Sequence, residues 1–202
     1  MRTIFMGNPN FAIPTLKAVH RSEHDLIAVV SNPPKPMGRG RSLQSTPVGN
    51  FARSNGIDLI EPISLRSDHL IDQLKELKPD LFVIVAYKIL PNALINIPTY
   101  GAINLHASLL PKYRGAGPIQ WALMNGDKDT GVTIFQIKQK VDTGNILLQD
   151  IFTTPITLPI SILSGLLLNE YVTQGFVIPF YIYSFFTTNP GTPRSYSSTT
   201  IY

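Results

Sequence analysis

Short apolar runs alternate with segments of helical periodicity along the first three quarters of this chain. The runs predict strands at residues 3–6, 26–30, 58–60, 81–86, 102–105, 132–137 and 146–148. Helical patterns lie between them at residues 11–20, 47–54, 68–77 and 118–124, with Asn10, Thr46 and Ser67 as expected N-caps of the first three. This alternation predicts an α/β fold, a Rossmann-like open and mostly parallel sheet with helices on both faces. Ligands of such sheets bind beyond the carboxyl ends of the strands, where the strand order reverses.

Length and composition bound the organisation of the chain. With 202 residues it can hold one sizeable domain, which we place at residues 1–150, followed by a segment of another kind at 151–202. The sequence has no cysteine, so it forms no disulfide and no cysteine-ligated zinc site. The apolar run near Met1 is too short for a signal peptide and is expected to form the first buried strand. These features favour a cytoplasmic protein.

Residues 151–202 differ sharply from the rest. They carry two charged side chains, Glu170 and Arg194, and their apolar runs are short and interrupted by proline. A membrane-spanning helix needs about 20 apolar residues, so we expect no membrane segment. Neither run has helical or strand periodicity, and we expect this atypical tail to be poorly ordered. A change of reading frame near residue 150 would produce such a shift in composition.

A basic segment precedes the second predicted helix. Residues 26–57 contain no Asp or Glu, whereas Lys35, Arg39 and Arg41 lie close together in a stretch rich in proline and glycine. This composition predicts a loop. Such a loop suits a polyanion, because Lys and Arg neutralise phosphates and release counterions. An ordinary solvated surface loop is the alternative on composition alone.

Residues 104–115, Asn-Leu-His-Ala-Ser-Leu-Leu-Pro-Lys-Tyr-Arg-Gly, begin at the end of a predicted strand. Asn104 and His106 are two residues apart, so their side chains point to one face of an extended backbone. An amide can donate a hydrogen bond to a developing oxyanion, and an imidazole can transfer protons near neutral pH. Asp142 lies in a predicted turn, where its carboxylate would favour the protonated imidazole if the two met.

Together these motifs resemble the methionyl-tRNA formyltransferase family over residues 1–150. The resemblance is carried by residues 104–115 and by Met6-Gly-Asn-Pro-Asn-Phe-Ala12, Lys35-Pro-Met-Gly-Arg-Gly40, Lys78-Pro-Asp80, Ala116-Gly-Pro-Ile-Gln-Trp-Ala122, Asn125-Gly-Asp127, Thr130-Gly-Val-Thr133 and Asp142-Thr-Gly144. It implies transfer of a formyl group from 10-formyltetrahydrofolate to the α-amino group of methionine on initiator tRNA, by a monomer that needs no metal.

The resemblance also implies roles for individual residues. The catalytic residues would be Asn104, His106 and Asp142. The folate contacts would be Ser108, Leu109, Leu110 and Pro111. The tRNA contacts would be Lys35, Arg39 and Arg41.

The sequence departs from this family at several positions. Residues 86–90 form a segment one residue shorter than the corresponding family loop. Lys88 and Lys140 stand where the family usually has glycine, and Asn145 stands where it often has an acidic residue. The family also has a C-terminal oligonucleotide-binding barrel, and nothing after Asp150 resembles it. Two alternatives therefore stay open: a formyltransferase of the same fold that acts on a sugar or ribotide amine, and a folded remnant without activity.

Overall fold

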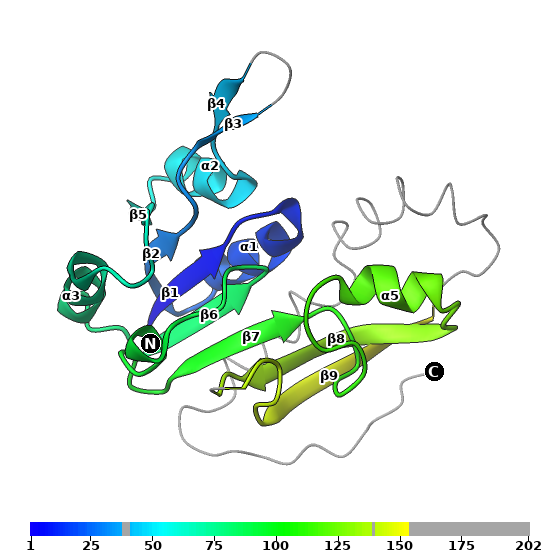
Figure 1. Cartoon of the computed structure of the whole chain (residues 1–202). Coiled ribbons are helices and arrows are strands. Elements are labelled where there is room, and N and C mark those ends of the chain that lie inside the picture. The colour runs from blue at the N-terminus through cyan, green and yellow to red at the C-terminus, as the bar shows by residue number, and fades with distance from the viewer. Residues whose placement is uncertain (38–40, 139, 154–202) are drawn as a thin grey trace.

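A seven-stranded sheet forms the centre of the computed structural model, which describes residues 1–37, 41–138 and 140–153 (Figure 1). The described strands comprise the seven of this sheet and two, β3 and β4, that form a separate hairpin. They are β1 (Arg2–Gly7), β2 (Asp25–Val30), β3 (Lys35–Met37), β4 (Ser42–Gln44), β5 (Leu59–Ile60), β6 (Leu81–Val85), β7 (Ala102–His106), β8 (Asp129–Gln136) and β9 (Ile146–Thr153). The helices are η1, a 3₁₀ turn (Asn10–Ala12), α1 (Ile13–Arg21), α2 (Pro47–Ser54), α3 (Asp68–Glu76), α4 (Asn92–Ile95) and α5 (Pro118–Met124).

The sheet has the strand order β5-β2-β1-β6-β7-β8-β9. Strands β5, β2, β1, β6 and β7 are parallel, whereas β8 and β9 extend the sheet in antiparallel pairing. The chain grows outward from β1 through β2 to β5 and then crosses to β6 on the other side of β1. The order reverses between β1 and β6, where ligands of such sheets bind. The predicted α/β class is therefore confirmed.

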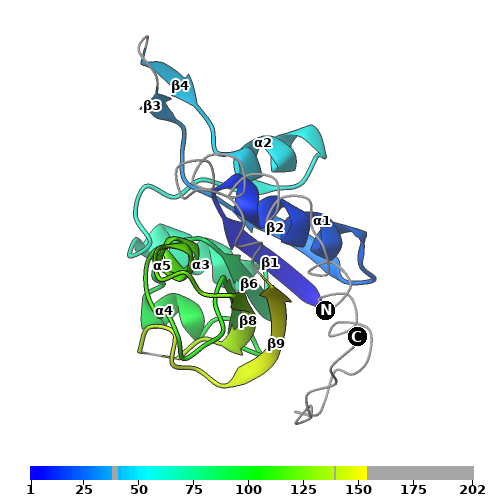
Figure 2. The same ribbon diagram turned by 90° about the vertical axis from the view of Figure 1, so that its right-hand side faces the viewer.

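Side chains alternate between two cores on the opposite faces of the sheet, as extended strands require. Phe5 of β1 packs in the core beneath α1 and α2, whereas Ile4 and Met6 pack in the core beneath α3 and α4. The buried run of β6 divides in the same way, with Val83 on the first face and Phe82 on the second. Figure 2 shows α1 and α2 on one side of β1 and α3 and α4 on the other.

Two of the three predicted helix caps are confirmed. The Thr46 side chain accepts a hydrogen bond from the Gly49 amide at 2.9 Å, and the Ser67 side chain accepts one from the Leu70 amide at 3.4 Å. The prediction that Asn10 caps the first helix is wrong. Asn10 opens the 3₁₀ turn η1, and α1 begins three residues later with no side-chain cap.

The basic segment is not wholly a loop. Strands β3 and β4 form a two-stranded antiparallel hairpin that projects away from the sheet in both views (Figures 1 and 2). All six residues of these strands are exposed, so the hairpin has no buried face that could give the sequence an alternating pattern.

The final described strand continues beyond the predicted domain boundary. Strand β9 runs to Thr153, and its last three residues pair with β8, as in Gly131 with Ile151. The predicted tail, residues 151–202, lies outside the described residues from position 154 onward. Within the described part of the chain, no helix is long and apolar enough to cross a membrane.

Candidate active site

A cavity of about 560 Å³ lies at the point where the strand order reverses. Its walls come from the segments that follow β1, β6 and β7 and from the loop between β8 and β9. The apolar part of the lining includes Ile84, Leu90, Ile95, Phe135 and Ile137. The size and the mixed lining are typical of a small-molecule site.

Asn104 and His106 reach this cavity from β7. Their neighbours Ile103 and Leu105 point into the core on the opposite face, so the predicted same-face arrangement is confirmed. His106 is 7% exposed, and its Nε2 donates a hydrogen bond to the Tyr113 carbonyl oxygen at 2.8 Å. Because a carbonyl oxygen only accepts, this contact assigns a proton to Nε2 and leaves Nδ1 facing Asp142.

Asp142 meets His106 from the loop between β8 and β9. Its Oδ2 lies 3.7 Å from His106 Nδ1 and accepts a hydrogen bond from the Gly115 amide at 2.9 Å. Asp142 has a φ of 49°, a left-handed conformation that Asp tolerates better than most residues. The Gly144 backbone lies so close to the Gln136 carbonyl that a Cβ atom there would overlap it. The Asp-Thr-Gly motif thus combines a left-handed backbone conformation at Asp142 with a close backbone approach at Gly144.

The loop after β7 is held by a buried hydroxyl that sequence reasoning did not single out. Thr133 Oγ1 in β8 donates to the Ser108 carbonyl oxygen at 2.6 Å and accepts from the Leu110 amide at 3.0 Å. Gln149 in β9 donates from Nε2 to the Leu110 carbonyl oxygen and to Thr133 Oγ1, each at 2.9 Å. The residues missed from the sequence are therefore Thr133 and Gln149, which fix the loop that carries the site. The only available signal was that Thr133 ends the motif Thr130-Gly-Val-Thr133.

The four predicted folate contacts lie in this same loop. The Ser108 side chain is fully buried and donates to the Lys112 carbonyl oxygen at 2.6 Å, and the Leu110–Pro111 peptide bond is cis. None of Ser108, Leu109, Leu110 and Pro111 is among the residues that line the cavity described here. A direct contact between these four residues and folate stays a prediction.

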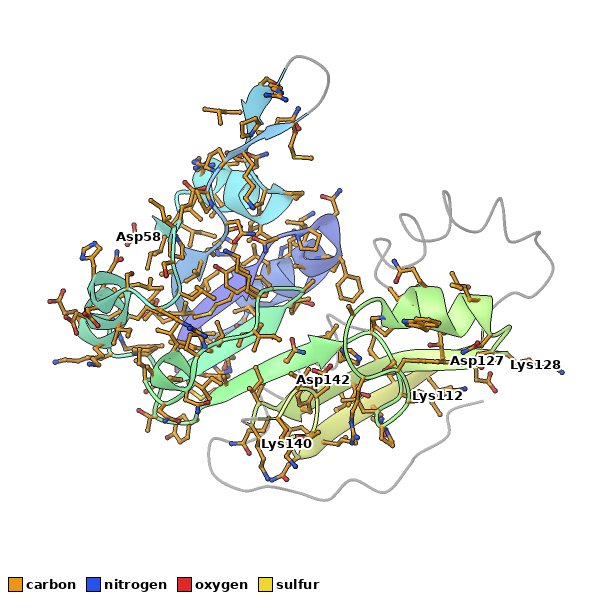
Figure 3. The ribbon with its side chains drawn as sticks, in the orientation of Figure 1. Asp58, Lys112, Asp127, Lys128, Lys140 and Asp142 are labelled. Carbon is orange, nitrogen blue, oxygen red and sulfur yellow. The ribbon has the colours of Figure 1, made fainter. Side chains whose placement is uncertain are left out.

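A surface ion pair stabilises the part of the loop after β7 that contains Lys112. Lys112 Nζ lies 2.7 Å from Asp127 Oδ2, and Figure 3 shows the two side chains together near the start of β8. The hydrogen bond with Lys112 lowers the pKa of Asp127, and the same bond raises the pKa of Lys112. The adjacent Tyr113 hydroxyl accepts a hydrogen bond from Asn125 Nδ2 at 2.8 Å. These contacts hold Tyr113, whose carbonyl oxygen is the partner of His106.

The shortened segment 86–90 forms one wall of the cavity. Ala86 adopts a φ of 48°, whereas Lys88 is not among the described residues with positive φ, so this lysine does not strain the backbone where the family usually has glycine. The Tyr87 hydroxyl is buried without a hydrogen-bond partner among the described atoms, and burial raises the pKa of Tyr87 to about 12.

The predicted tRNA contacts lie elsewhere. Lys35 is in β3 and Arg41 precedes β4, both exposed on the projecting hairpin, and neither lines the cavity. Arg39 lies outside the described residues. In the part of the chain that the structure describes, no group of three or more His, Cys, Asp or Glu side chains could hold a metal ion.

Known proteins match this chain in sequence over its first three quarters. The family described as "Formyl transferase" matches residues 1–157. The methionyl-tRNA formyltransferase of Agathobacter rectalis is 47% identical over 148 residues, which cover 73% of this chain and 48% of that protein. Its counterpart from Thermodesulfovibrio yellowstonii is 51% identical over 147 residues, which cover 72% of this chain and 48% of that protein. The chain thus spans about half the length of these relatives.

Solved structures share the fold at lower identity. A phosphoribosylglycinamide formyltransferase from Bacillus halodurans matches with a TM-score of 0.73 and 17% identity, covering 93% of this chain and 96% of that one. One from Streptococcus pneumoniae matches with a TM-score of 0.70 and 21% identity, covering 92% and 99%. At these identities the likeness shows the fold alone. The family match over residues 1–157 shows more, and the chain belongs to the formyl transferase family.

Proposed function

We propose that this chain transfers a formyl group from 10-formyltetrahydrofolate to the α-amino group of methionine on initiator tRNA. The observation that carries the proposal is the meeting of Asn104, His106 and Asp142 around one cavity. The names of the relatives supply the acceptor, since those proteins are methionyl-tRNA formyltransferases with close to half of their sequence positions identical over the shared region. The donor binds in the cavity and supplies the formyl group.

The reaction forms one carbon–nitrogen bond and breaks another. The α-amino nitrogen attacks the formyl carbon and loses a proton, and the nitrogen that leaves the formyl carbon gains one. Negative charge builds on the formyl oxygen during the attack. The Asn104 amide lines the cavity, and it can donate a hydrogen bond to that oxygen without changing its own charge.

His106 and Asp142 move the proton. Because Nε2 donates its hydrogen bond to the Tyr113 carbonyl oxygen, the other ring nitrogen, Nδ1, exchanges the proton. Nδ1 is the nitrogen that faces Asp142. The carboxylate stabilises the imidazolium that forms when Nδ1 takes up a proton. It is itself fixed by the Gly115 amide, so the pair is oriented before substrates arrive.

The exposed hairpin supports tRNA as the acceptor. Lys35 and Arg41 stand on a projecting element that meets no other part of the sheet, an arrangement suited to phosphates of a large ligand. Direct contact of the four residues Ser108–Leu109–Leu110–Pro111 with folate belongs to the same proposal, as do a monomeric state, a cytoplasmic location and catalysis without metal. Light scattering would check the monomeric state.

The test is formyl transfer to methionyl-tRNA by the 202-residue chain, with His106→Ala compared to His69→Ala. His69 is exposed on α3, away from the cavity, so its replacement controls for the loss of an imidazole. We expect His106→Ala to abolish transfer and His69→Ala to retain it, with both variants folded. Retained transfer in His106→Ala would remove this residue from the mechanism.

Two further outcomes separate the alternatives. Transfer to an amino sugar or a ribotide amine, but not to charged tRNA, would replace the acceptor that we propose. A chain that folds but binds folate weakly or not at all, and transfers to none of these amines, would be a remnant of the family.

A further inference from the structure

A cluster of hydrogen bonds joins the end of β1 to both ends of the segment that carries the hairpin. This segment leaves β2 at Ser31 and returns at Thr46, the N-cap of α2. The Ser31 hydroxyl is fully buried and donates to the Gly7 carbonyl oxygen at 2.8 Å. Because that bond uses the one proton of Ser31, the Thr46 hydroxyl donates to Ser31 Oγ across 2.5 Å. The two hydroxyls therefore hold the two ends of the segment together.

Asn8 binds both ends of the same segment. Its side-chain Oδ1 accepts a hydrogen bond from the Asn32 amide at 2.9 Å, before the hairpin begins. Its main-chain oxygen accepts one from the Val48 amide at 3.3 Å, after the hairpin has ended. Asn8 directly follows β1, and nearby Phe11 lines the cavity. One residue thus connects the base of the hairpin to the edge of the sheet that carries the cavity.

The chain between this cluster and the hairpin is stiff. Pro33 and Pro34 stand between Asn32 and Lys35, the first residue of β3. Proline fixes its own φ, and the residue before a proline is confined to extended conformations. A rotation of the backbone at Asn32 is therefore transmitted to Lys35, so holding the Asn32 amide holds the direction in which the hairpin leaves the sheet.

The direction of the hairpin depends on its base. Strands β3 and β4 pair only with each other, all six of their residues are exposed, and both views show the hairpin standing clear of the sheet (Figures 1 and 2). We propose that Asn8 is a positioning residue, which fixes the direction in which the hairpin presents Lys35 and Arg41 to the acceptor tRNA. The inference rests on the proposed function for the identity of that acceptor.

The direction of the hairpin can be measured without any substrate. The chain has no cysteine, so Leu43→Cys on β4 and Lys17→Cys on α1 together provide two unique sites for spin labels. Leu43 is 72% exposed and Lys17 is also exposed, so neither label disturbs the core. Pulsed electron paramagnetic resonance then gives the distribution of distances between the two labels in the full chain.

Three variants at asparagine positions locate the effect. Asn8→Ala removes the oxygen that accepts from the Asn32 amide, so we expect a broader distribution of distances. Asn8→Asp keeps an oxygen acceptor at this place and should keep the narrow distribution. Asn92→Ala is the matched control, since Asn92 is exposed at the start of α4 and does not line the cavity. Circular dichroism checks that each variant is folded.

The same variants link the hairpin to the acceptor. Loss of one hydrogen bond changes an equilibrium constant by about two- to tenfold, so Asn8→Ala should weaken the binding of methionyl-tRNA by about that factor. Fluorescence anisotropy measures this binding. Because Asn8 does not line the cavity, the dissociation constant of folate and the value of kcat at saturating tRNA should stay unchanged.

The outcomes distinguish this inference from the proposed function. An unchanged distribution of distances in Asn8→Ala would overturn the inference, and so would a broader distribution with unchanged binding of tRNA. A fall in kcat without weaker binding would also overturn it, because Asn8 would then act on the cavity and not on the hairpin. If the wild-type chain bound tRNA but transferred no formyl group, the proposed function would fail and the inference would stand. A wild-type chain that binds no tRNA would sink both.

Discussion

Thr133 offers a quantitative test of how the site is held. Its side chain is fully buried, and its hydroxyl serves the Ser108 carbonyl, the Leu110 amide and the Gln149 side chain at once. Thr133→Val keeps the shape of the side chain and removes all three hydrogen bonds. The Leu110 amide and the Ser108 carbonyl then stay buried without this partner, whereas exposed Gln149 can turn to water.

The expected cost follows from these two buried groups. A buried polar group left unsatisfied costs about 1–3 kcal/mol, so we expect the two groups together to lower the free energy of unfolding of Thr133→Val by about 2–6 kcal/mol. Thr133→Ser is the matched control, because it keeps the hydroxyl and loses one methyl group, at a cost of about 1 kcal/mol. Urea denaturation monitored by circular dichroism measures both variants.

The comparison also tests the link to function. Because the loop anchored by Thr133 leads to Tyr113, whose carbonyl binds His106, the Val variant should lose formyl transfer at temperatures where it remains folded. If the Val variant were as stable as the Ser variant, the hydroxyl network would not hold the loop and the reasoning would fail.

Two further predictions concern charge. Asp142→Asn keeps the shape of the side chain but removes the stabilising charge beside the imidazole, so kcat should fall by about 10²- to 10⁴-fold with the fold retained, as measured in the tRNA assay. Asp127 has a lowered pKa in the folded chain, so its contribution to stability is present above its ordinary pKa and is lost as pH falls through the lowered value. Lys112 has a raised pKa, so its contribution is present below its ordinary pKa and is lost only as pH rises through the raised value. The stability difference between the wild type and Asp127→Asn should therefore be constant between about pH 5 and 9 and shrink at lower pH, and a difference that changes around pH 7 would contradict this account.

The elements that were predictable from the sequence are those with a buried face. The runs that became β1, β6 and β7 are apolar because both faces of a parallel strand are covered, so their pattern follows directly from their environment. Asn104 and His106 could be placed on one face of β7 because side chains two residues apart in a strand point the same way. The hairpin of β3 and β4 has no buried face, so its sequence shows no alternation of apolar and polar residues that would predict strands.

Contacts between distant segments could not be predicted from local patterns. Gln149 reaches Leu110 across 39 positions of the chain, and its side chain gives no local sign of that partner. Asn10 failed as a cap for a related reason, because the turn that starts at Pro9 continues as a 3₁₀ helix before α1 begins. Short polar residues favour several local structures, and the surrounding backbone decides among them.

The length of β9 leads to a final prediction about the boundary expected at Asp150. From composition alone, truncation after Asp150 should cost little stability. In the structure Ile151, Phe152 and Thr153 continue the pairing with β8, so this truncation removes the end of the ladder that carries Thr133 and Gln149. A ladder hydrogen bond contributes about 0.5–1.5 kcal/mol, and we expect a chain of residues 1–150 to be about 1–3 kcal/mol less stable than one of residues 1–157, which spans the family match. Both truncated chains would be compared with the full chain by urea denaturation, and equal stability of the two would place the boundary at Asp150 after all. A measured loss would mean that β8 and β9, which carry the anchors of the loop after β7 and whose connecting loop carries Asp142, belong to the catalytic unit through Thr153.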